Sequence, residues 1–151
     1  QPLIFSGTLR ENILLGNPEA TDEELMEVAR VTGVDALASM LPDGFDTKLT
    51  ERGQQLSGGQ RQAICIARAL VNPSKILLMD EPTSAMDTNT EMAMMKNIMA
   101  FARNRTIIMV THRGSLVDLA DRIMVMDSGR VVADGPRDEI KQKLRGGAQA
   151  S

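Results

Sequence analysis

Aromatic residues are nearly absent from this chain. Three phenylalanines stand without a single tryptophan or tyrosine. Any pocket here that stacks a nucleobase must therefore take its aromatic platform from residues outside the chain. Methionine, by contrast, occurs eleven times. We interpret these flexible side chains as irregular core filling, and a Met-rich binding surface is the alternative.

Cysteine is scarce as well, and long apolar runs and a net positive charge are lacking. Cys65 is the only cysteine, which excludes an internal disulfide and suits a reducing compartment. No apolar run approaches the roughly 18–20 residues that cross a bilayer. The net charge of −3 provides no positive field for nucleic acid or anionic lipid, so we expect no nucleic-acid partner. The chain begins at Gln1 without a methionine, and we expect it to be a fragment.

Residues 1–70 read as mainly helical. The capping-box spacing of Thr or Ser followed three residues later by Glu or Gln marks three helix starts. These lie at Thr8–Glu11, Thr21–Glu24 and Ser57–Gln60. We also expect a short helix at 35–40, a loop at 45–55, and a helix after Ser57 that ends at Asn72-Pro73.

Residues 71–145 alternate between short apolar runs and helical segments. The runs Ile76–Met79 and Thr106–Val110 read as strands covered on both faces, with a helix from Thr88 to about Ala102 between them. This alternation predicts a parallel sheet in an α/β fold. Further on we expect a short helix at 115–120, a hairpin with strands at 123–126 and 131–133, a helix at 136–144, and a disordered tail at 146–151.

Two adjacent carboxylates follow the first apolar run. Asp80 and Glu81 come directly after Ile76–Met79, and open α/β sheets bind ligands at the carboxyl ends of their strands. Because successive strand side chains point to opposite faces, the two carboxylates should serve different purposes. One could hold Mg²⁺ through water and the other could orient or deprotonate an attacking water. The alternative is two charges that only cap a strand at the surface.

The pentapeptide Leu56-Ser57-Gly58-Gly59-Gln60 precedes a helix. Its glycines would let a phosphate approach the backbone closely, and the helix start offers free N–H groups and a positive dipole end. An ordinary helix cap is the alternative, because Ser57 and Gln60 also have capping-box spacing. His112, the only histidine, follows the second apolar run and could hydrogen-bond a phosphate oxygen or simply be satisfied at a strand end.

Together these segments resemble the nucleotide-binding domains of ABC transporters. Residues 56–60 look like the signature motif, and 76–81 look like the Walker B strand with its following glutamate. Residues 82–87 look like the D-loop region and Thr111-His112 like the switch histidine, while Gln1 stands where the family has its Q-loop glutamine. Five elements occur in the family's order over nearly the whole chain.

The resemblance implies a role for each motif residue. Glu81 would be the general base, Asp80 would serve Mg²⁺, and His112 would hold the γ-phosphate of ATP. Gln1 would contact Mg²⁺ or the attacking water. Asp87 would link the two composite sites across a dimer of nucleotide-binding domains. Four residues would contact the γ-phosphate of ATP bound to the opposite subunit, namely Ser57, Gly58, Gly59 and Gln60.

The phosphate-binding loop of that family, Gly-x-x-x-x-Gly-Lys-Ser/Thr, is missing. Neither Gly58-Gly59 nor Gly146-Gly147 is followed by Lys and Ser or Thr. No backbone nest would therefore cradle the α- and β-phosphates, and no lysine would reach the β- and γ-phosphates. We expect a partial P-loop NTPase domain, a helical subdomain followed by a parallel-sheet α/β part, that does not hydrolyse ATP alone.

The resemblance also indicates a transporter class. Residues 50–53 resemble the loop that exporters place against their membrane domains, although a glycine is common where Thr50 stands. Residues 84–87 and 111–116 look like the ATPases of bacterial type I secretion exporters, which implies a protein or peptide cargo. The chain would then act at the cytoplasmic face of the inner membrane, on transmembrane domains that lie outside it.

Several other functions stay open. The ATPase of a multidrug or lipid exporter usually has leucine at position 86 and another sequence after Arg113. A non-catalytic or regulatory half-domain could donate its signature motif to another ATPase, and importers or soluble translation ATPases belong to the same superfamily. A chromosome-maintenance ATPase is disfavoured, because a long coiled coil would separate Gln1 from Leu56, which follows by only 55 positions.

Overall fold

The fold is taken from a computed structural model that describes residues 2–147. The chain forms two compact units, Gln1–Val110 and Thr111–Ser151, and each is described by itself. The expected subdivision after residue 70 marks a change from helices to alternating strands and helices. It does not coincide with the boundary between units, because α4 (Gly58–Val71) and β3 (Ile76–Asp80) both belong to the N-terminal unit.

A cluster of helices forms most of the N-terminal unit. The helix α4 contacts the three preceding helices, α1 (Leu9–Leu14), α2 (Asp22–Thr32) and α3 (Val34–Ser39). All three expected capping boxes are present, at Thr8, Thr21 and Ser57. In each, the cap side chain accepts a hydrogen bond from the backbone N–H three residues on, which satisfies a donor that the first turn leaves open.

The segment expected to be a loop at 45–55 contains short regular elements. A two-residue strand β2 (Lys48–Leu49) pairs antiparallel with β1 (Gly7–Thr8), and single 3₁₀ turns η1 (Gly44–Asp46) and η2 (Glu51–Gly53) flank it. Elements this short carry no periodic pattern, so the sequence could not reveal them. They bring residues 48–53 alongside the N-terminal segment, where the N–H of Arg52 donates to the carbonyl of Ile4 at 3.1 Å.

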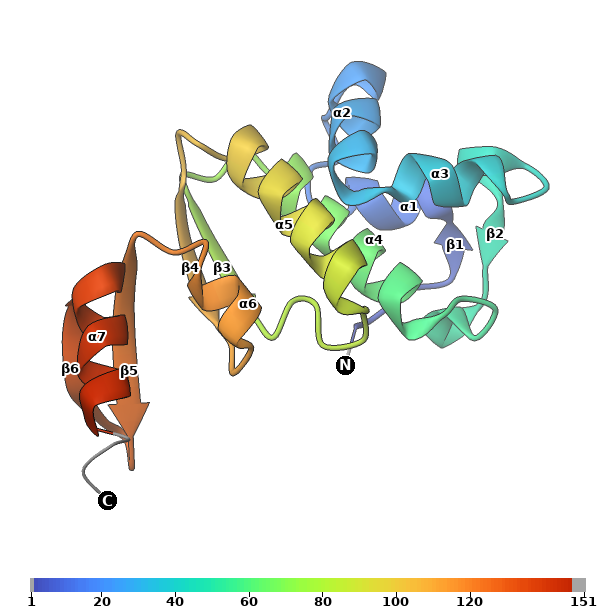
Figure 1. Cartoon of the computed structure of the whole chain (residues 1–151). Helices are drawn as coiled ribbons and strands as arrows, with labels where there is room; N and C mark the ends of the chain where they lie inside the picture. The colour runs from blue at the N-terminus through green and yellow to red at the C-terminus, as the bar shows by residue number, and fades with distance from the viewer. Residues whose placement is uncertain (1, 148–151) are drawn as a thin grey trace. The chain divides into compact units, whose positions relative to one another are not determined.

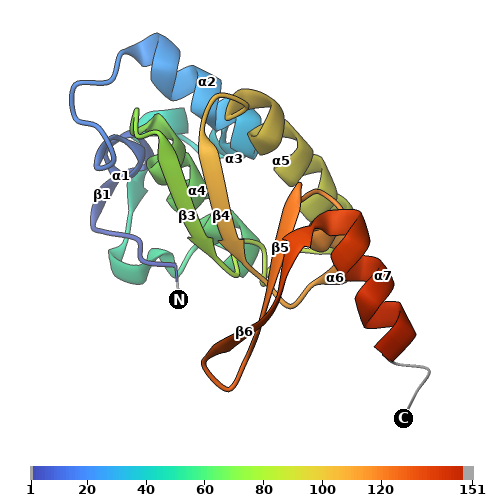
Figure 2. The same cartoon turned by 90° about the vertical axis from the view of Figure 1, so that its left-hand side faces the viewer.

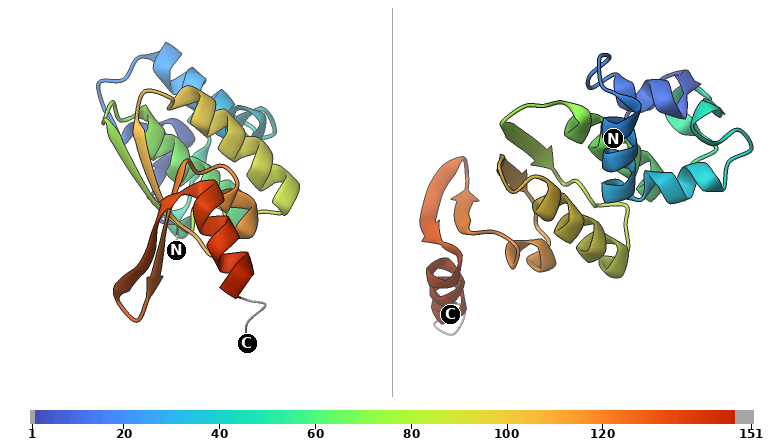
Figure 3. Two further views of the ribbon diagram at one scale, coloured as in Figure 1. Left: turned by 60° about the vertical axis from the view of Figure 1, so that its left-hand side comes forward. Right: turned by 90° about the horizontal axis from the view of Figure 1, so that it is seen from above.

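The strands β3 and β4 (Thr106–Val110) are parallel and in register from Ile76↔Thr106 to Asp80↔Val110, as predicted (Figure 2). Helices α4 and α5 (Thr88–Phe101) lie on one side of this pair (Figures 1 and 3). The expectation of cover on both faces is wrong for the described residues. Leu77 and Met79 are buried, but the alternate side chains Ile76 and Leu78 are 60% and 74% exposed.

The C-terminal unit consists of a short helix, a hairpin and a last helix, as expected. Helix α6 (Gly114–Val117) precedes β5 (Arg122–Asp127) and β6 (Arg130–Pro136), which pair antiparallel around a turn with positive φ at Ser128 and Gly129. Helix α7 (Arg137–Gly147) begins one residue later than predicted, because Pro136 still belongs to β6. It also extends into the segment expected to be disordered, of which residues 148–151 lie outside the described part.

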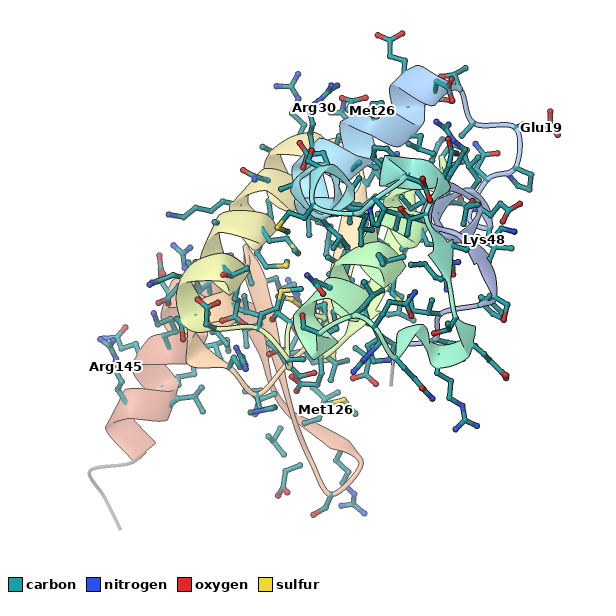
Figure 4. All side chains as sticks on the ribbon, turned by 90° about the vertical axis from the view of Figure 1, so that its right-hand side faces the viewer. Glu19, Met26, Arg30, Lys48, Met126 and Arg145 are labelled. Carbon is teal, nitrogen blue, oxygen red and sulfur yellow. The ribbon has the colours of Figure 1, made fainter. Side chains whose placement is uncertain are left out.

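The methionines support core filling more than a methionine-rich surface. Met79, Met86, Met94 and Met95 are all buried in the N-terminal unit. Met26 on α2 is half-buried, whereas Met126 in the hairpin is 64% exposed; both are labelled in Figure 4. The exposed methionines are few: Met40 follows α3, and Met124 and Met126 lie on β5.

Candidate functional site

The two carboxylates occupy the carboxyl end of β3. Asp80 is the last residue of the strand and lies on its exposed face. Glu81 follows in the left-handed region with φ 45, and its N–H donates to the carbonyl of Val110 at 2.9 Å. A non-glycine residue in this region is uncommon and stores backbone strain, which surrounding contacts must hold. The strand end therefore carries two adjacent carboxylates on different backbone conformations, Asp80 in the strand and Glu81 in the left-handed region.

An open cavity of about 450 Å³ adjoins these carboxylates in the N-terminal unit. Its wall combines the end of β3, the loop after it and one face of α4. The polar side chains among its lining are Gln62, Cys65, Asp80, Glu81 and Ser84. A cavity with convergent polar groups at the carboxyl end of a parallel strand is the expected place for a ligand in an α/β sheet.

The signature residues form the first turn of α4. The Ser57 N–H donates to the Gln60 side-chain oxygen at 2.8 Å, and the Gln60 N–H donates to the Ser57 hydroxyl oxygen at 3.2 Å. The helix-cap interpretation is therefore confirmed by a reciprocal capping box, and the contact of this turn with a phosphate stays a prediction.

Gly58 and Gly59 have a use that the sequence analysis missed. A Cβ on Gly58 would lie 2.9 Å from the Cβ of Ala85, and one on Gly59 would lie 3.4 Å from the Ala85 carbonyl oxygen. The two glycines thus let the loop that follows Glu81 pack directly on the start of α4. No spacing rule in the sequence signals this contact, which joins residues far apart in the chain.

Asp87 caps the next helix. Its carboxylate accepts hydrogen bonds from the backbone N–H groups of Asn89 and Thr90 and from the Thr90 hydroxyl, at 3.1, 3.0 and 2.6 Å. These bonds, led by that of the Thr90 hydroxyl, lower the pKa of Asp87 below its usual value. The structure therefore gives Asp87 a role within its own helix; the cross-dimer role stays a prediction.

Gln62 and Glu91 are buried polar residues that the sequence analysis did not single out. Gln62 is 6% exposed and Glu91 is fully buried, and both face the loop at 82–87. The sequence could have revealed both, because each is a polar residue on the helix face that otherwise carries buried apolar side chains. Gln62 stands one turn before Ile66, and Glu91 one turn before Met95.

The two remaining candidate residues are His112 and Gln1. His112 belongs to the C-terminal unit, between β4 and α6 in the sequence. Gln1, the Q-loop candidate, lies outside the described residues. Among residues 2–147, no group of three or more His, Cys, Asp or Glu side chains could hold a metal ion. Two carboxylates do fit Mg²⁺ held jointly with nucleotide phosphates, which needs only one or two protein carboxylates.

Sequence and structure comparisons agree on the family. The ABC transporter family pattern matches residues 3–84, more than half of the chain. The chain belongs to the ABC transporter family. It is similar to a bacterial Atm1-family ABC exporter solved with ATP bound, with a TM-score of 0.87 and 35% identity, over 99% of this chain and 27% of that one. The fold is thus confirmed as part of an ABC-type P-loop NTPase domain.

Curated relatives match nearly the whole chain. The mycobactin import ATP-binding/permease protein IrtB of Mycolicibacterium smegmatis is 46% identical over 93% of the chain and 24% of its own length. ABC transporter B family member 1 of Arabidopsis thaliana is 43% identical over 99% of the chain and 12% of its own length. The chain thus spans about a quarter or less of these relatives. No helix among its described residues has the length and apolar character of a membrane span.

Proposed function

We propose that this chain supplies the signature helix, the catalytic carboxylates and the D-loop of an ABC nucleotide-binding domain that hydrolyses ATP to drive transport. One observation carries the proposal. The carboxylates at the end of β3 and the signature turn of α4 meet the same short loop, at 82–87, within one compact unit. If Asp80 and Glu81 were only surface charges at a strand end, there would be no reason for the loop after them to pack on two glycines at the start of α4.

We propose for each residue the role that the family resemblance implies, and phosphoryl-transfer chemistry, which depends mainly on positioning and charge stabilisation, agrees with these roles. Glu81 would accept a proton from the attacking water, and Asp80 would hold Mg²⁺. Bound Mg²⁺ would neutralise charge that develops on the phosphate oxygens. Ser57, Gly58, Gly59 and Gln60 offer a helix start to the γ-phosphate of ATP on the opposite domain. His112 holds the γ-phosphate of the chain's own ATP, and Gln1 contacts Mg²⁺ or water.

The chain lacks the phosphate-binding loop, so we propose that it does not hydrolyse ATP alone. Within residues 2–147, β3 pairs only with β4. The apolar side chains Ile76, Leu78, Ile108 and Val110 on the exposed face of this pair are 49–74% exposed. A phosphate-loop segment that completes the domain would reduce this exposure, because parallel sheets normally bury both faces.

The transport role rests on the family. We propose that the completed domain dimerises, binds transmembrane domains of an exporter and acts at the cytoplasmic face of the inner membrane. Residues 84–87 and 111–116 support a type I secretion exporter with a protein or peptide cargo. A relative named for mycobactin import favours a small-molecule transporter as the second candidate. Uptake assays with one labelled peptide and one siderophore in membrane vesicles would separate the two.

ATP hydrolysis tests the proposal. The chain is assayed alone and then after assembly with a separately produced segment of an ABC domain that carries the phosphate-binding loop. We expect activity only in the assembled domain and its loss with Glu81→Gln. A folded, associated assembly without activity would contradict the proposal and favour a regulatory half-domain. Activity of the chain alone would refute the expected dependence on the missing loop.

A further inference from the structure

We infer that Gln62 is a positioning residue for Glu81, because it fastens the loop after Glu81 to the signature helix. The inference rests on the proposed function, in which Glu81 is the general base. It goes beyond that function by proposing that Gln62 couples the position of the signature helix to the position of the Glu81 carboxylate. Gln62 lines the cavity beside Glu81, but its side-chain oxygen and nitrogen are both bonded to the loop, so we assign it a positioning role.

The side-chain amide of Gln62 makes hydrogen bonds in both directions. Its oxygen accepts the Ala85 N–H at 2.9 Å, and its nitrogen donates to the Ser84 hydroxyl at 2.7 Å. The same nitrogen lies 3.5 Å from the carbonyl oxygen of Glu81, a longer and weaker contact. Gln62 itself is 6% exposed, whereas Ser84 and Ala85 lie at the surface, so removing the Gln62 amide releases the loop from α4 and leaves the polar groups of the loop to water.

The contact between helix and loop is continuous from Gly58 to Gln62. Ala85 packs on the Gly58 backbone so closely that an added Cβ would be 2.9 Å from its own Cβ. Gln62, little more than one turn further along α4, then binds the backbone of Ala85 and the side chain of Ser84. The first two turns of α4 and residues 84–85 are therefore held together by close packing and by the two hydrogen bonds of Gln62.

The loop transmits this constraint to Glu81 because its far side is fixed too. The Thr83 hydroxyl donates to the carboxylate of the buried Glu91 on α5 at 2.5 Å. The Glu81 N–H is held by Val110, and the Glu81 backbone has φ 45. A strained conformation persists only where neighbours fix it. With α5 and β4 holding two points, the hydrogen bonds of Gln62 and the packing of Ala85 on Gly58 are the contacts that depend on the position of the signature helix.

The test compares kcat and KM for ATP in the domain assembled with a phosphate-loop segment. Gln62→Leu keeps a similar volume and removes both hydrogen bonds. We expect kcat per folded domain to fall roughly tenfold or more while KM changes less than twofold, since a displacement of about 1 Å near a reacting group can cost about 10²-fold in rate. Ser84→Ala removes one partner and should give a smaller fall in kcat. Combined with Gln62→Leu it should add little, because both changes break one contact.

Asn12→Leu is the matched control. Asn12 on α1 is another buried amide, 1% exposed, whose side chain bonds the backbone of Phe5 and Thr8 and the Arg68 guanidinium on α4, but not the loop at 82–87. Its loss should lower stability and leave kcat per folded domain unchanged. A Gln62→Leu domain with kcat within twofold of the parent would overturn the inference, as would additive effects of Gln62→Leu and Ser84→Ala.

The outcomes separate this inference from the function on which it rests. If Glu81→Gln abolishes hydrolysis while Gln62→Leu leaves it intact, the inference fails and the proposed function stands. If Glu81→Gln is fully active, the proposed function fails. Should Gln62→Leu not fold, Ser84→Ala decides alone, because its side chain is exposed and its removal leaves the core unchanged. An unchanged kcat for that variant would overturn the inference.

Discussion

The N-terminal unit, residues 1–110, and the C-terminal unit, residues 111–151, are stabilised by different interactions. The buried apolar side chains of the described residues lie in the N-terminal unit, apart from Leu116 and Ile140. In the C-terminal unit, the strand residues Met124, Met126, Val131 and Val132 are 53–64% exposed. The candidate site is therefore built on the unit that has a core, as a site that needs fixed geometry requires.

Surface ion pairs are prominent where the core is small. Arg122 pairs with Asp134 at 2.8 Å, Arg137 pairs with Asp138 at 2.8 Å, and Lys141 pairs with Asp118. Each cation donates a side-chain hydrogen bond to its carboxylate and attracts it by charge. Both effects lower the pKa of Asp118, Asp134 and Asp138 below the usual value. Exposed pairs of this kind contribute little stability. The C-terminal unit should therefore respond to pH and salt, and the N-terminal unit to cavities and clashes.

Truncation in the core should give the largest effect. Ile64 on α4 is fully buried, and Ile64→Ala should lower the free energy of unfolding by about 2–5 kcal/mol through lost burial and the cavity left behind. The matched change Val132→Ala, on the exposed face of the hairpin, should stay within about 0.5 kcal/mol. Urea denaturation followed by circular dichroism measures both. Equal losses would contradict the difference between the units.

A close helix contact should give the next largest effect. A Cβ on Gly16 would lie 1.9 Å from the Arg68 carbonyl oxygen, so Gly16→Ala must push α4 away and should cost about 1–3 kcal/mol. Gly114→Ala in the C-terminal unit is the control, because a Cβ there meets nothing within 4 Å. Thermal unfolding of the two variants measures the difference. A fully stable Gly16→Ala chain would show that this contact is not close.

Acid should act first on the C-terminal unit. Asp118, Asp134 and Asp138 have a lowered pKa in the folded state, so each binds its proton more readily when unfolded. Their contribution is complete above the unfolded pKa of about 3.9 and is lost as pH falls through the lower folded values. Amide hydrogen exchange, corrected for intrinsic rates, should show β5 and β6 losing protection below about pH 4 before α4 does. The reverse order would contradict the account.

Salt should have the smallest effect. Raising ionic strength to about 1 M shortens the Debye length to about 3 Å and screens exposed pairs. We expect slightly lower protection of β5 and β6 and no change in α4. Asp134→Asn, which removes the Arg122 pair, should make the hairpin less sensitive to salt. An equal salt response of the variant and the parent would show that this pair contributes nothing.

Local signals in the sequence predicted much of this fold. The capping boxes at Thr8, Thr21 and Ser57 gave three helix starts, because they depend only on residues three apart. The strands at 76–80 and 106–110 and their parallel pairing also followed from apolar runs separated by a helix. The exposed face of those strands could not be predicted. An apolar sequence indicates that burial would be favourable, but it does not indicate whether the described chain contains a segment that covers the strand.

The site was predictable in its motifs and less so in its contacts. The sequence identified Asp80, Glu81 and the turn at 57–60, but not the packing of Ala85 on Gly58 or the bonds of Gln62. Those contacts join residues more than twenty positions apart, and no periodicity records them. The left-handed backbone of Glu81 was equally hidden, because glutamate has no preference for that conformation.

Single-turnover ATP hydrolysis by the assembled domain with Glu81→Gln tests the central claim most directly. General-base catalysis typically contributes about 10²–10⁴-fold, so the variant should bind ATP as tightly as the parent and hydrolyse it at least about 10²-fold more slowly. That result would establish Glu81, held at the end of β3, as the base of an ABC ATPase. Hydrolysis at the parental rate would contradict the account.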